Sequence, residues 1–363
     1  MYPSMWSNVS FEMEEFCKIL PKIELHAHVN GSISAETMEK IIHNKDLVGV
    51  DMLKLNKWIH SVKKGEKKNL DETFEMFKIM HQLVTDTDTV SMVTYDVIKE
   101  FANDNVRYLE LRSTPRDVPS TGMTKQSYVE AVLQAIEKCM QENVKIIVRF
   151  LLSVDRSRGV NVAMETVQLA KQFKESSKGI VIGVDLSGNP NVGDMNDFVP
   201  VLKEAKNAGL KLALHIAERT NHVEESALLL SIPPDRIGHG TFLHPEVGGR
   251  QDLVDMTQKY NIPIETCLTS NVLGRTVPSF DKHHFKYWYD KKHPCIVCTD
   301  DKGLMLTSSS AEYIIVSNTF HFTKQQLYDI SFNSIDCIFE NDKIKDELRS
   351  QWETSKNFLD LQK

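Results

Sequence analysis

The stretch KIELHAHVNG, residues 22–31, is typical of a short β-strand that ends in a turn. Alternate side chains of a strand share one face, so His26, His28 and Asn30 are expected to point the same way at its carboxyl end. Two imidazoles on one face can bind a single divalent metal ion. The remaining ligands then have to come from distant parts of the chain.

Further apolar, β-rich runs follow this first strand, and most gaps between them hold amphipathic helical segments such as 125–142 and 164–176. Strands that alternate with helices, without a Pro/Gly/Ser-rich linker, predict one parallel α/β domain over residues 1–363. Eight such units match a closed (β/α)8 TIM barrel. An open doubly wound sheet is the alternative, and the lack of a Gly-rich phosphate motif after the first strand counts against it. The later runs are 107–113, 145–154, 180–186, 210–216, 236–241, 262–268 and 295–299.

Three other segments are expected to be helical. Residues 1–20 predict a lead-in helix, and residues 321–363 predict a helical tail packed on the outside of the barrel. Apolar residues at helical spacing in 70–84 predict an amphipathic helix that lies in the core or forms a wall of the active site.

Bulk composition excludes several classes of function. The chain has 363 residues and a formal net charge of −7, which does not favour nucleic acid or anionic membranes. No apolar run approaches the roughly 20 residues that a membrane span needs. The acidic N-terminus lacks signal-peptide character, so we expect a cytosolic enzyme. No interface stripe stands apart from the core, and a monomer is expected.

Cysteine usage agrees with a reducing compartment. Six cysteines are scattered along the chain, too sparsely for a disulfide scaffold. Cys295 and Cys298 form a CxxC, but a spacing of three in a strand puts them on opposite faces. Reduced thiols in the core are therefore expected.

Polar residues that could take part in catalysis or metal binding cluster where the predicted strands end. In a barrel these carboxyl ends meet at one mouth, where such enzymes keep their active sites. A lone histidine is more often structural than a ligand, and an acid pair is more often a cap or a solvated turn. Jointly, the order HxH, then H, then D on strands one, five and eight is much harder to obtain by chance. The residues are His26, His28, Asn30, Ser113, Thr114, Pro115, Arg116, Asp155, Asp185, Gly188, His215, Glu218, His239, Asn271, Asp300 and Asp301.

Three imidazoles and one carboxylate suit Zn²⁺, whereas a magnesium or calcium site would use oxygen ligands. Zinc lowers the pKa of its water from 15.7 to about 7. Asp301 and His239 are positioned to orient the resulting hydroxide, and Glu218 to donate a proton. These residues predict metal-assisted hydrolytic attack at an electron-poor carbon.

These motifs, in this order and spacing from about residue 20 to 340, resemble the adenosine deaminase family: HAH at 26–28, DLSG at 185–188, HIAE at 215–218, GHG at 238–240, TSN at 269–271 and CTDD at 298–301. The resemblance implies a barrel of the metal-dependent hydrolase type that binds one zinc ion per chain and hydrolytically removes the 6-amino group of a purine. The zinc ligands that it implies are His26, His28, His215 and Asp300.

The resemblance also assigns roles around the purine ring. Glu218 would protonate N1 as hydroxide attacks C6, while His239 and Asp301 would orient the hydroxide, with Asp301 also near N7. Gly188 would offer its backbone N–H to N3, and Glu24 is interpreted as structural.

Position 30 departs from the family pattern HxHLDG, in which an aspartate lies near the ribose 5′-hydroxyl. This chain has Asn30 there. A carboxylate would repel a 5′-phosphate by about 4 kcal/mol at 4 Å and an effective dielectric near 20. Asparagine removes that repulsion and can donate a hydrogen bond.

With STPR at 113–116, SNVLGRTVPS at 270–279 and HHF at 283–285, the chain is most similar to the adenosine deaminase-like branch of the family. That branch converts N6-methyl-AMP to IMP and methylamine. On physical grounds we choose Arg116 as the residue that binds the phosphate. The alternative, that Arg116 is an ordinary arginine in a surface loop, has equal weight. The expected substrate contacts are His28, Asn30, His81, Ser113, Thr114, Pro115, Arg116, Asp155, Gly188 and Asp301.

Two other functions remain open at this point. One is ordinary deamination of adenosine, which position 30 disfavours. The other is a catalytically inactive barrel that only binds purines, against which intact Glu218, His239 and Asp301 argue. Editing of nucleic acid is disfavoured because the chain is acidic and has no basic groove with interleaved aromatics.

Overall fold

The computed structural model describes residues 11–45, 49–66, 70–359 and 361. Eight parallel strands follow each other in chain order around one sheet. The sheet closes between the first and last strands, where the Asp300 N–H donates to the His26 carbonyl at 2.8 Å and the His28 N–H donates to the Asp300 carbonyl at 3.2 Å. The predicted (β/α)8 barrel is therefore confirmed. Its strands are β1 (Lys22–His28), β2 (Val106–Ser113), β3 (Ile147–Asp155), β4 (Val181–Ser187), β5 (Lys211–Ile216), β6 (Arg236–His239), β7 (Ile264–Thr266) and β8 (Cys295–Val297).

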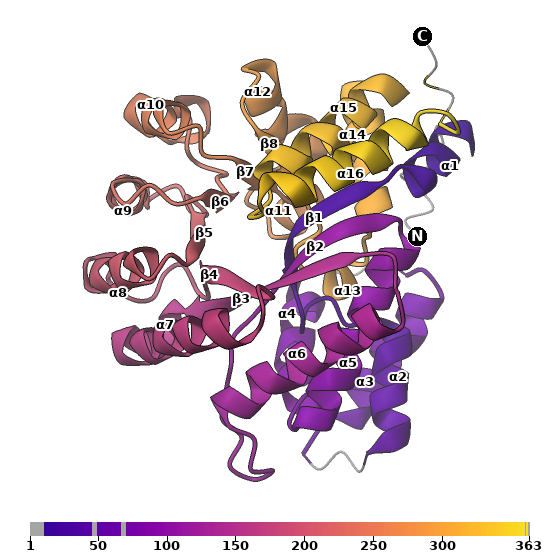
Figure 1. Ribbon diagram of the computed structural model, residues 1–363, viewed down its shortest axis with the longest axis vertical. Coiled ribbons are helices and arrows are strands. Elements are labelled where there is room, and N and C mark those ends of the chain that lie inside the picture. Colours follow the sequence, from indigo (N-terminus) through magenta and orange to yellow (C-terminus); the bar gives the residue numbers. More distant parts are fainter. Residues whose placement is uncertain (1–10, 46–48, 67–69, 360, 362–363) are drawn as a thin grey trace.

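Helices surround the strands, and Figure 1 shows α7 to α10 side by side along the outside of β3 to β7. A group of helices is inserted between β1 and β2, namely α2 (Ala35–Asn44), α3 (Met52–Lys63), α4 (Leu70–Leu83) and α5 (Thr87–Asn103). The others are α1 (Phe11–Ile19), α6 (Lys125–Gln141), α7 (Gly159–Ser176), α8 (Met195–Asn207), α9 (Val223–Leu230), α10 (Gln251–Lys259), α11 (Leu268–Leu273), α12 (Phe285–Asp290), α13 (Lys302–Met305), α14 (Ser309–Phe320), α15 (Lys324–Asn333) and α16 (Asp342–Ser355).

Helix α1, from the first described residues, lies beside α14 from the C-terminal part of the chain (Figure 1). Helix α1 covers the described part of the expected lead-in segment, since residues 1–10 lie outside the described residues. Phe16 and Leu20 share a buried cluster with Tyr313 and Trp352. The Ser331 hydroxyl links both ends, because it donates to the Pro21 carbonyl at 2.5 Å and accepts from the Trp352 indole at 3.0 Å.

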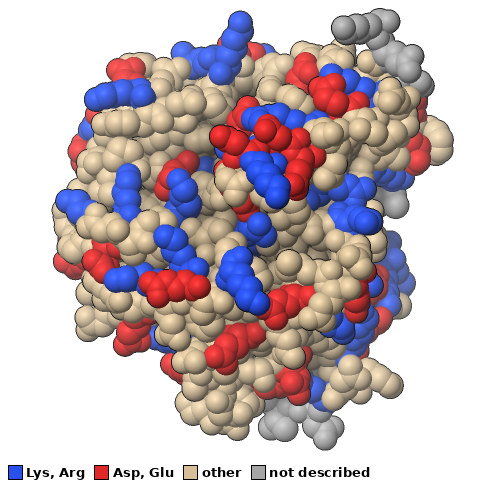
Figure 2. Space-filling model, viewed as in Figure 1, with Lys and Arg blue, Asp and Glu red and all other residues tan. Residues whose placement is uncertain are grey.

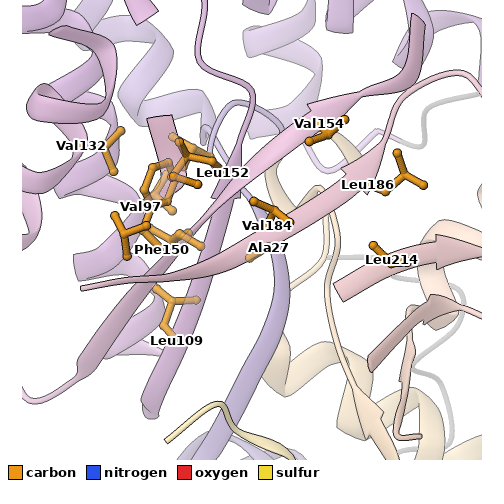
Figure 3. Close-up of a cluster of buried hydrophobic side chains, with 14 of the residues drawn as sticks. Ala27, Val97, Leu109, Val132, Phe150, Leu152, Val154, Val184, Leu186 and Leu214 are labelled. Atoms are coloured by element: carbon orange, nitrogen blue, oxygen red, sulfur yellow. The ribbon is translucent and has the colours of Figure 1, made fainter. Parts of the chain in front are cut away.

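The outer faces of the strands form the main hydrophobic core. Figure 3 shows Leu109 of β2 and Phe150 and Leu152 of β3 gathered with Val97 of α5 and Val132 of α6. All five are fully buried. On β3 every second residue from Val148 to Val154 is apolar, and Leu109 and Leu111 share one face of β2, so the helices cover an apolar surface.

The interior of the barrel is polar, in contrast to the layers of branched apolar residues usual in this fold. Arg112 of β2 donates to Asp185 of β4 at 3.1 Å and to Glu265 of β7 at 2.9 Å. Arg236 of β6 donates to the other oxygen of Glu265 at 2.6 Å. Strand β2 neighbours neither β4 nor β7, so the two contacts of Arg112 cross the barrel interior, whereas Arg236 and Glu265 lie on adjacent strands.

One predicted strand was too long, and the difference affects the site. The run 262–268 was expected to end as a strand, but β7 stops at Thr266 and Leu268 begins helix α11. Thr269, Ser270 and Asn271 therefore project from the first turns of a helix rather than from a strand end.

Thiols and surface charges agree with the composition. All six cysteines are free, and only Cys295 is less than fully buried, as expected for reduced core thiols. Figure 2 shows basic and acidic side chains interspersed over one face of the molecule. None of the helices in the described part of the chain combines the length and apolar character that a bilayer crossing requires.

Candidate active site

A cavity of about 710 Å³ opens at the carboxyl ends of the strands. Every residue predicted to be catalytic lines this cavity, as does every predicted substrate contact except Pro115, which is buried beside Thr114. His28, His215 and Asp300 also line it, whereas His26 is completely buried beneath. Helix α4 contributes Thr73, Phe77 and His81 to the wall.

Histidines form a compact cluster at the floor. The ring centroids of His26 and His215 are 4.6 Å apart, and those of His26 and His28 are 5.3 Å apart. Oδ1 of Asp300 lies 3.6 Å from Nε2 of His26 and 3.5 Å from Nε2 of His28. Nε2 of His26 is buried without a hydrogen-bond partner, as expected of a nitrogen reserved for a metal ion. The residues therefore fit a divalent metal.

Two buried carboxylates hold the opposite ring nitrogens. Nδ1 of His26 donates to Glu265 at 2.7 Å. Nδ1 of His215 lies 2.9 Å from Asp185, an ion-pair contact without hydrogen-bond geometry. Carboxylates placed in this way leave Nε2 of each ring for the metal. Burial lowers the pKa of His28 to about 4 and holds that of His26 well below its usual value, so both rings are neutral, as metal binding requires.

His239 is part of the same cluster, and its ligand atom lies within 4.8 Å of those of His26 and His215. A chain of hydrogen bonds assigns its tautomer. The Phe285 N–H donates to Nδ1 of His283 at 3.1 Å, so Nε2 of His283 carries the proton and donates to Oδ1 of Asn271 at 3.0 Å. The Asn271 amide then donates to Nδ1 of His239 at 3.3 Å.

The proton of His239 therefore lies on Nε2. This nitrogen faces Glu218 at 3.7 Å and Asp300 at 3.8 Å. A protonated Nε2 cannot bind a metal ion but can donate a hydrogen bond to an attacking oxygen. This arrangement favours the predicted orienting role of His239 over a role as a metal ligand.

Three residues with left-handed backbone conformation turn the chain at the mouth. Ala217 has φ 58°, His239 has φ 61° and Asp300 has φ 62°. Such conformations are uncommon for residues other than glycine and cluster at functional sites. The turn at Ala217 follows β5 directly and brings Glu218 to the cavity that also contains His215.

Close packing fixes the acid pair at the end of β8. The Ser270 hydroxyl donates to Oδ2 of Asp300 at 2.7 Å. A Cβ atom at position 31 would lie 1.5 Å from Oδ1 of Asp301, so only glycine fits there. Burial and the charge of Asp300 raise the pKa of Asp301 well above its usual value.

A second part of the cavity wall is polar and cationic. The Ser113 hydroxyl is 2.6 Å from that of Tyr128, which lies beside Asn30. Nη1 of Arg116 donates to Nδ1 of His81 at 2.7 Å, and Nη2 donates to the carbonyls of His81 and Val84. Arg116 thus caps helix α4, and its terminal nitrogens are engaged within the protein. This geometry does not support the expectation that Arg116 binds phosphate.

The contact with Arg116 determines which ring nitrogen of His81 is the hydrogen-bond donor. Burial and Arg116 lower the pKa of His81 to about 4, and its Nδ1 accepts from Arg116. The neutral ring therefore carries its proton on Nε2. Arg158 also lines the cavity, and among the described residues its side chain bonds only through Nε, at 3.3 Å from Asp155.

A glycine is required at position 188, because Asp155 at the end of the adjacent strand leaves no room for a side chain. It has φ 100°, a conformation that favours glycine, and a Cβ atom there would lie 2.3 Å from Oδ1 of Asp155. Its backbone therefore comes close to the cavity beside Asp155, as the predicted contact with a purine N3 needs.

Comparison with known proteins identifies the family. The family model described as adenosine deaminase matches residues 21–355. The chain belongs to the adenosine deaminase family. The prediction of a hydrolase that acts on a purine C–N bond is therefore confirmed.

Individual family members are similar over almost their whole length. A protein of Danio rerio named N6-methyl-AMP deaminase is 53% identical, with 94% of this chain and 97% of the relative covered. One of Homo sapiens with the same name is 52% identical, with 93% and 94% covered. The crystal structure of the Arabidopsis N6-mAMP deaminase has a TM-score of 0.83 at 38% identity, covering 94% and 99%. Arabidopsis ADAL complexed with IMP has a TM-score of 0.81 at 36% identity, covering 94% and 99%.

Within this family site, several residues were not predicted from the sequence. Arg112, Glu265, His283 and Arg158 had no assigned role, and Cys267 was not expected near His26 and Asp300. One signal was available in β2, where Glu110 and Arg112 alternate with Leu109 and Leu111. The partners of these residues come from other strands, which no local pattern identifies.

Proposed function

We propose that this chain is a zinc-dependent deaminase that converts N6-methyl-AMP and water to IMP and methylamine. The observation that carries the proposal is one cavity whose lining combines a histidine–carboxylate cluster with an uncharged Asn30 and the cations Arg116 and Arg158. The names of the relatives support the same substrate.

In this proposal His26, His28, His215 and Asp300 hold the zinc ion. Bound zinc would supply hydroxide at neutral pH by lowering the pKa of a water molecule to about 7. The protein residues contribute orientation and proton transfer. Nε2–H of His239 and the carboxyl group of Asp301 orient the attacking oxygen toward C6. Glu218 protonates N1, and the Gly188 N–H donates to N3.

A substrate panel tests the proposal. We expect purified protein to turn over N6-methyl-AMP faster than AMP, adenosine and N6-methyladenosine at equal concentration, with release of IMP and methylamine. Activity should disappear with a chelator and return with Zn²⁺. Faster turnover of adenosine would make this chain an adenosine deaminase instead, and full activity after chelation would exclude a metal mechanism.

We propose that Arg158 and the Nε2–H of His81 recognise the 5′-phosphate near Asn30. We expect Arg158→Ala and Asn30→Asp each to lower kcat/KM for N6-methyl-AMP by about tenfold or more, because a charge-assisted hydrogen bond contributes about 1.5–3 kcal/mol. The same variants should change kcat/KM for N6-methyladenosine much less. Arg219→Ala is the matched control, since Arg219 lines the cavity beside Glu218. If Arg219→Ala lowered kcat/KM for the nucleotide more than Arg158→Ala does, the phosphate would lie beside Arg219 instead.

We also propose that the protein acts as a monomer in the cytosol. Its free cysteines support a reducing compartment. Its large exposed apolar side chains lie on elements as separate as α3, α6 and α10–β7. Light scattering and fractionation of expressing cells test the two statements, and a dimer or a membrane-pellet location would contradict them.

A further inference from the structure

The guanidinium of Arg112 lies directly beneath the histidine cluster and is completely buried. Its Nη1 donates to Oδ1 of Asp185 at 3.1 Å, and its Nη2 donates to Oε2 of Glu265 at 2.9 Å. Nη2 also donates to the carbonyl of Leu25, one residue before His26. One side chain of β2 thereby joins β1, β4 and β7.

The two carboxylate oxygens that Arg112 contacts are the same atoms that contact the histidines. Oε2 of Glu265 accepts from Nδ1 of His26 at 2.7 Å, and Oδ1 of Asp185 lies 2.9 Å from Nδ1 of His215. Each carboxylate therefore stands between the fork of Arg112 and one imidazole. A rotation of the guanidinium would move both oxygens and, with them, both rings.

We propose that Arg112 is a positioning residue that holds His26 and His215 together in metal-binding orientation through Glu265 and Asp185. This inference rests on the proposed metal site but not on the identity of the substrate. The planar fork of arginine can bind two carboxylates at once in fixed directions, whereas a lysine ammonium on a flexible stem acts as one point charge.

Arg236 provides a matched control within the same barrel interior. It is equally buried and also donates to Glu265, but to Oε1 at 2.6 Å, the oxygen that does not contact His26. Its other contacts are Glu110 and the carbonyl of Cys337. Lysine at position 112 or 236 replaces a buried guanidinium by a single ammonium group. Only the guanidinium of Arg112 contacts the carboxylate oxygens that face the histidines.

The experiment compares zinc affinity of the full-length Arg112→Lys and Arg236→Lys proteins. Metal-free protein is titrated with Zn²⁺ in competition with a chromophoric chelator, and thermal unfolding of each metal-free variant is recorded. We expect Arg112→Lys to weaken zinc binding about 10–100-fold, the usual cost of losing a partner of a metal ligand. Arg236→Lys should lower the unfolding temperature similarly but change zinc affinity much less. Equal losses of zinc affinity would make Arg112 merely structural and overturn the inference.

A double-mutant cycle gives a second measurement that does not depend on the folding of Arg112→Lys. Asp185→Asn and Glu265→Gln each disturb one histidine, and both carboxylates share Arg112. We expect their combined effect on zinc affinity to differ from the product of the separate effects, because residues in one network are not additive. A simple product would overturn the inference. Wild-type protein that takes up no zinc would overturn the proposed metal site together with it, whereas a failed cycle on zinc-binding wild type would overturn this inference alone.

Discussion

Glu218→Gln is expected to lower kcat/KM for N6-methyl-AMP by about 10²–10⁴-fold, the range that a positioned general acid contributes. Glutamine has nearly the same shape but carries no acidic proton to give to N1. The turn at Ala217 and the contact with His239 at 3.7 Å would be retained, so the fold and the cavity should not change. The measurement is steady-state kinetics together with zinc content, because Glu218 is not a proposed ligand.

Measuring the zinc content shows whether Glu218→Gln loses activity through proton transfer or through loss of the metal ion. We expect the Glu218→Gln protein to retain one zinc ion per chain and to bind IMP as the wild type does. Glu224→Gln serves as the control for loss of a negative charge in the same region, since Glu224 is mostly exposed on helix α9. Activity within a few-fold of wild type in Glu218→Gln would remove the residue from the proposed proton transfer.

The strand order could be predicted because each strand of the barrel has an apolar outer face. Leu109, Phe150 and Leu152 are buried on that face, and each belongs to an apolar, β-rich run that is visible in one short window of sequence. The element ends were less accurate. Residues 262–268 contain no Gly or Asn that would mark a strand end, yet β7 ends at Thr266 and α11 begins at Leu268.

The predicted site residues converge because parallel strands end at one mouth, which is a property of the fold class. The sequence does not show which hydrogen-bond donors of a side chain are already bonded to other parts of the protein. Arg116 follows β2 at the right place for a phosphate, but it caps α4 through His81 and Val84. Arg158 lies just beyond β3, at the end of η1 (Arg156–Arg158), and lines the cavity.

The charged barrel interior was not predicted for the same reason. Arg112, Asp185, Glu265 and Arg236 come from four strands, and no local pattern in any one strand identifies partners on the others. Buried charges are stable only when they are paired and hydrogen-bonded. Here the pairing also serves the site, because the network ends at the histidine nitrogens that face away from the metal position.

Asp300→Asn is expected to weaken zinc binding more than 100-fold, since even loss of an outer partner of a metal ligand costs about 10–100-fold. The substitution removes the negative charge that lies 3.6 Å from His26 and 3.5 Å from His28. Chelator competition measures the effect, and deaminase activity should fall in parallel and be partly restored at high Zn²⁺.

Ser270→Ala is the graded control for that substitution. It leaves the charge of Asp300 in place and removes only the hydrogen bond to Oδ2, which is 2.7 Å long. We expect it to weaken zinc binding by less than Asp300→Asn, within the 10–100-fold range of an outer partner. Because Ser270 is also buried, both variants are compared as metal-free proteins by thermal unfolding. Zinc affinity that is unchanged in Asp300→Asn would show that the metal is held by the histidines alone, and Asp300 would then act on the attacking water.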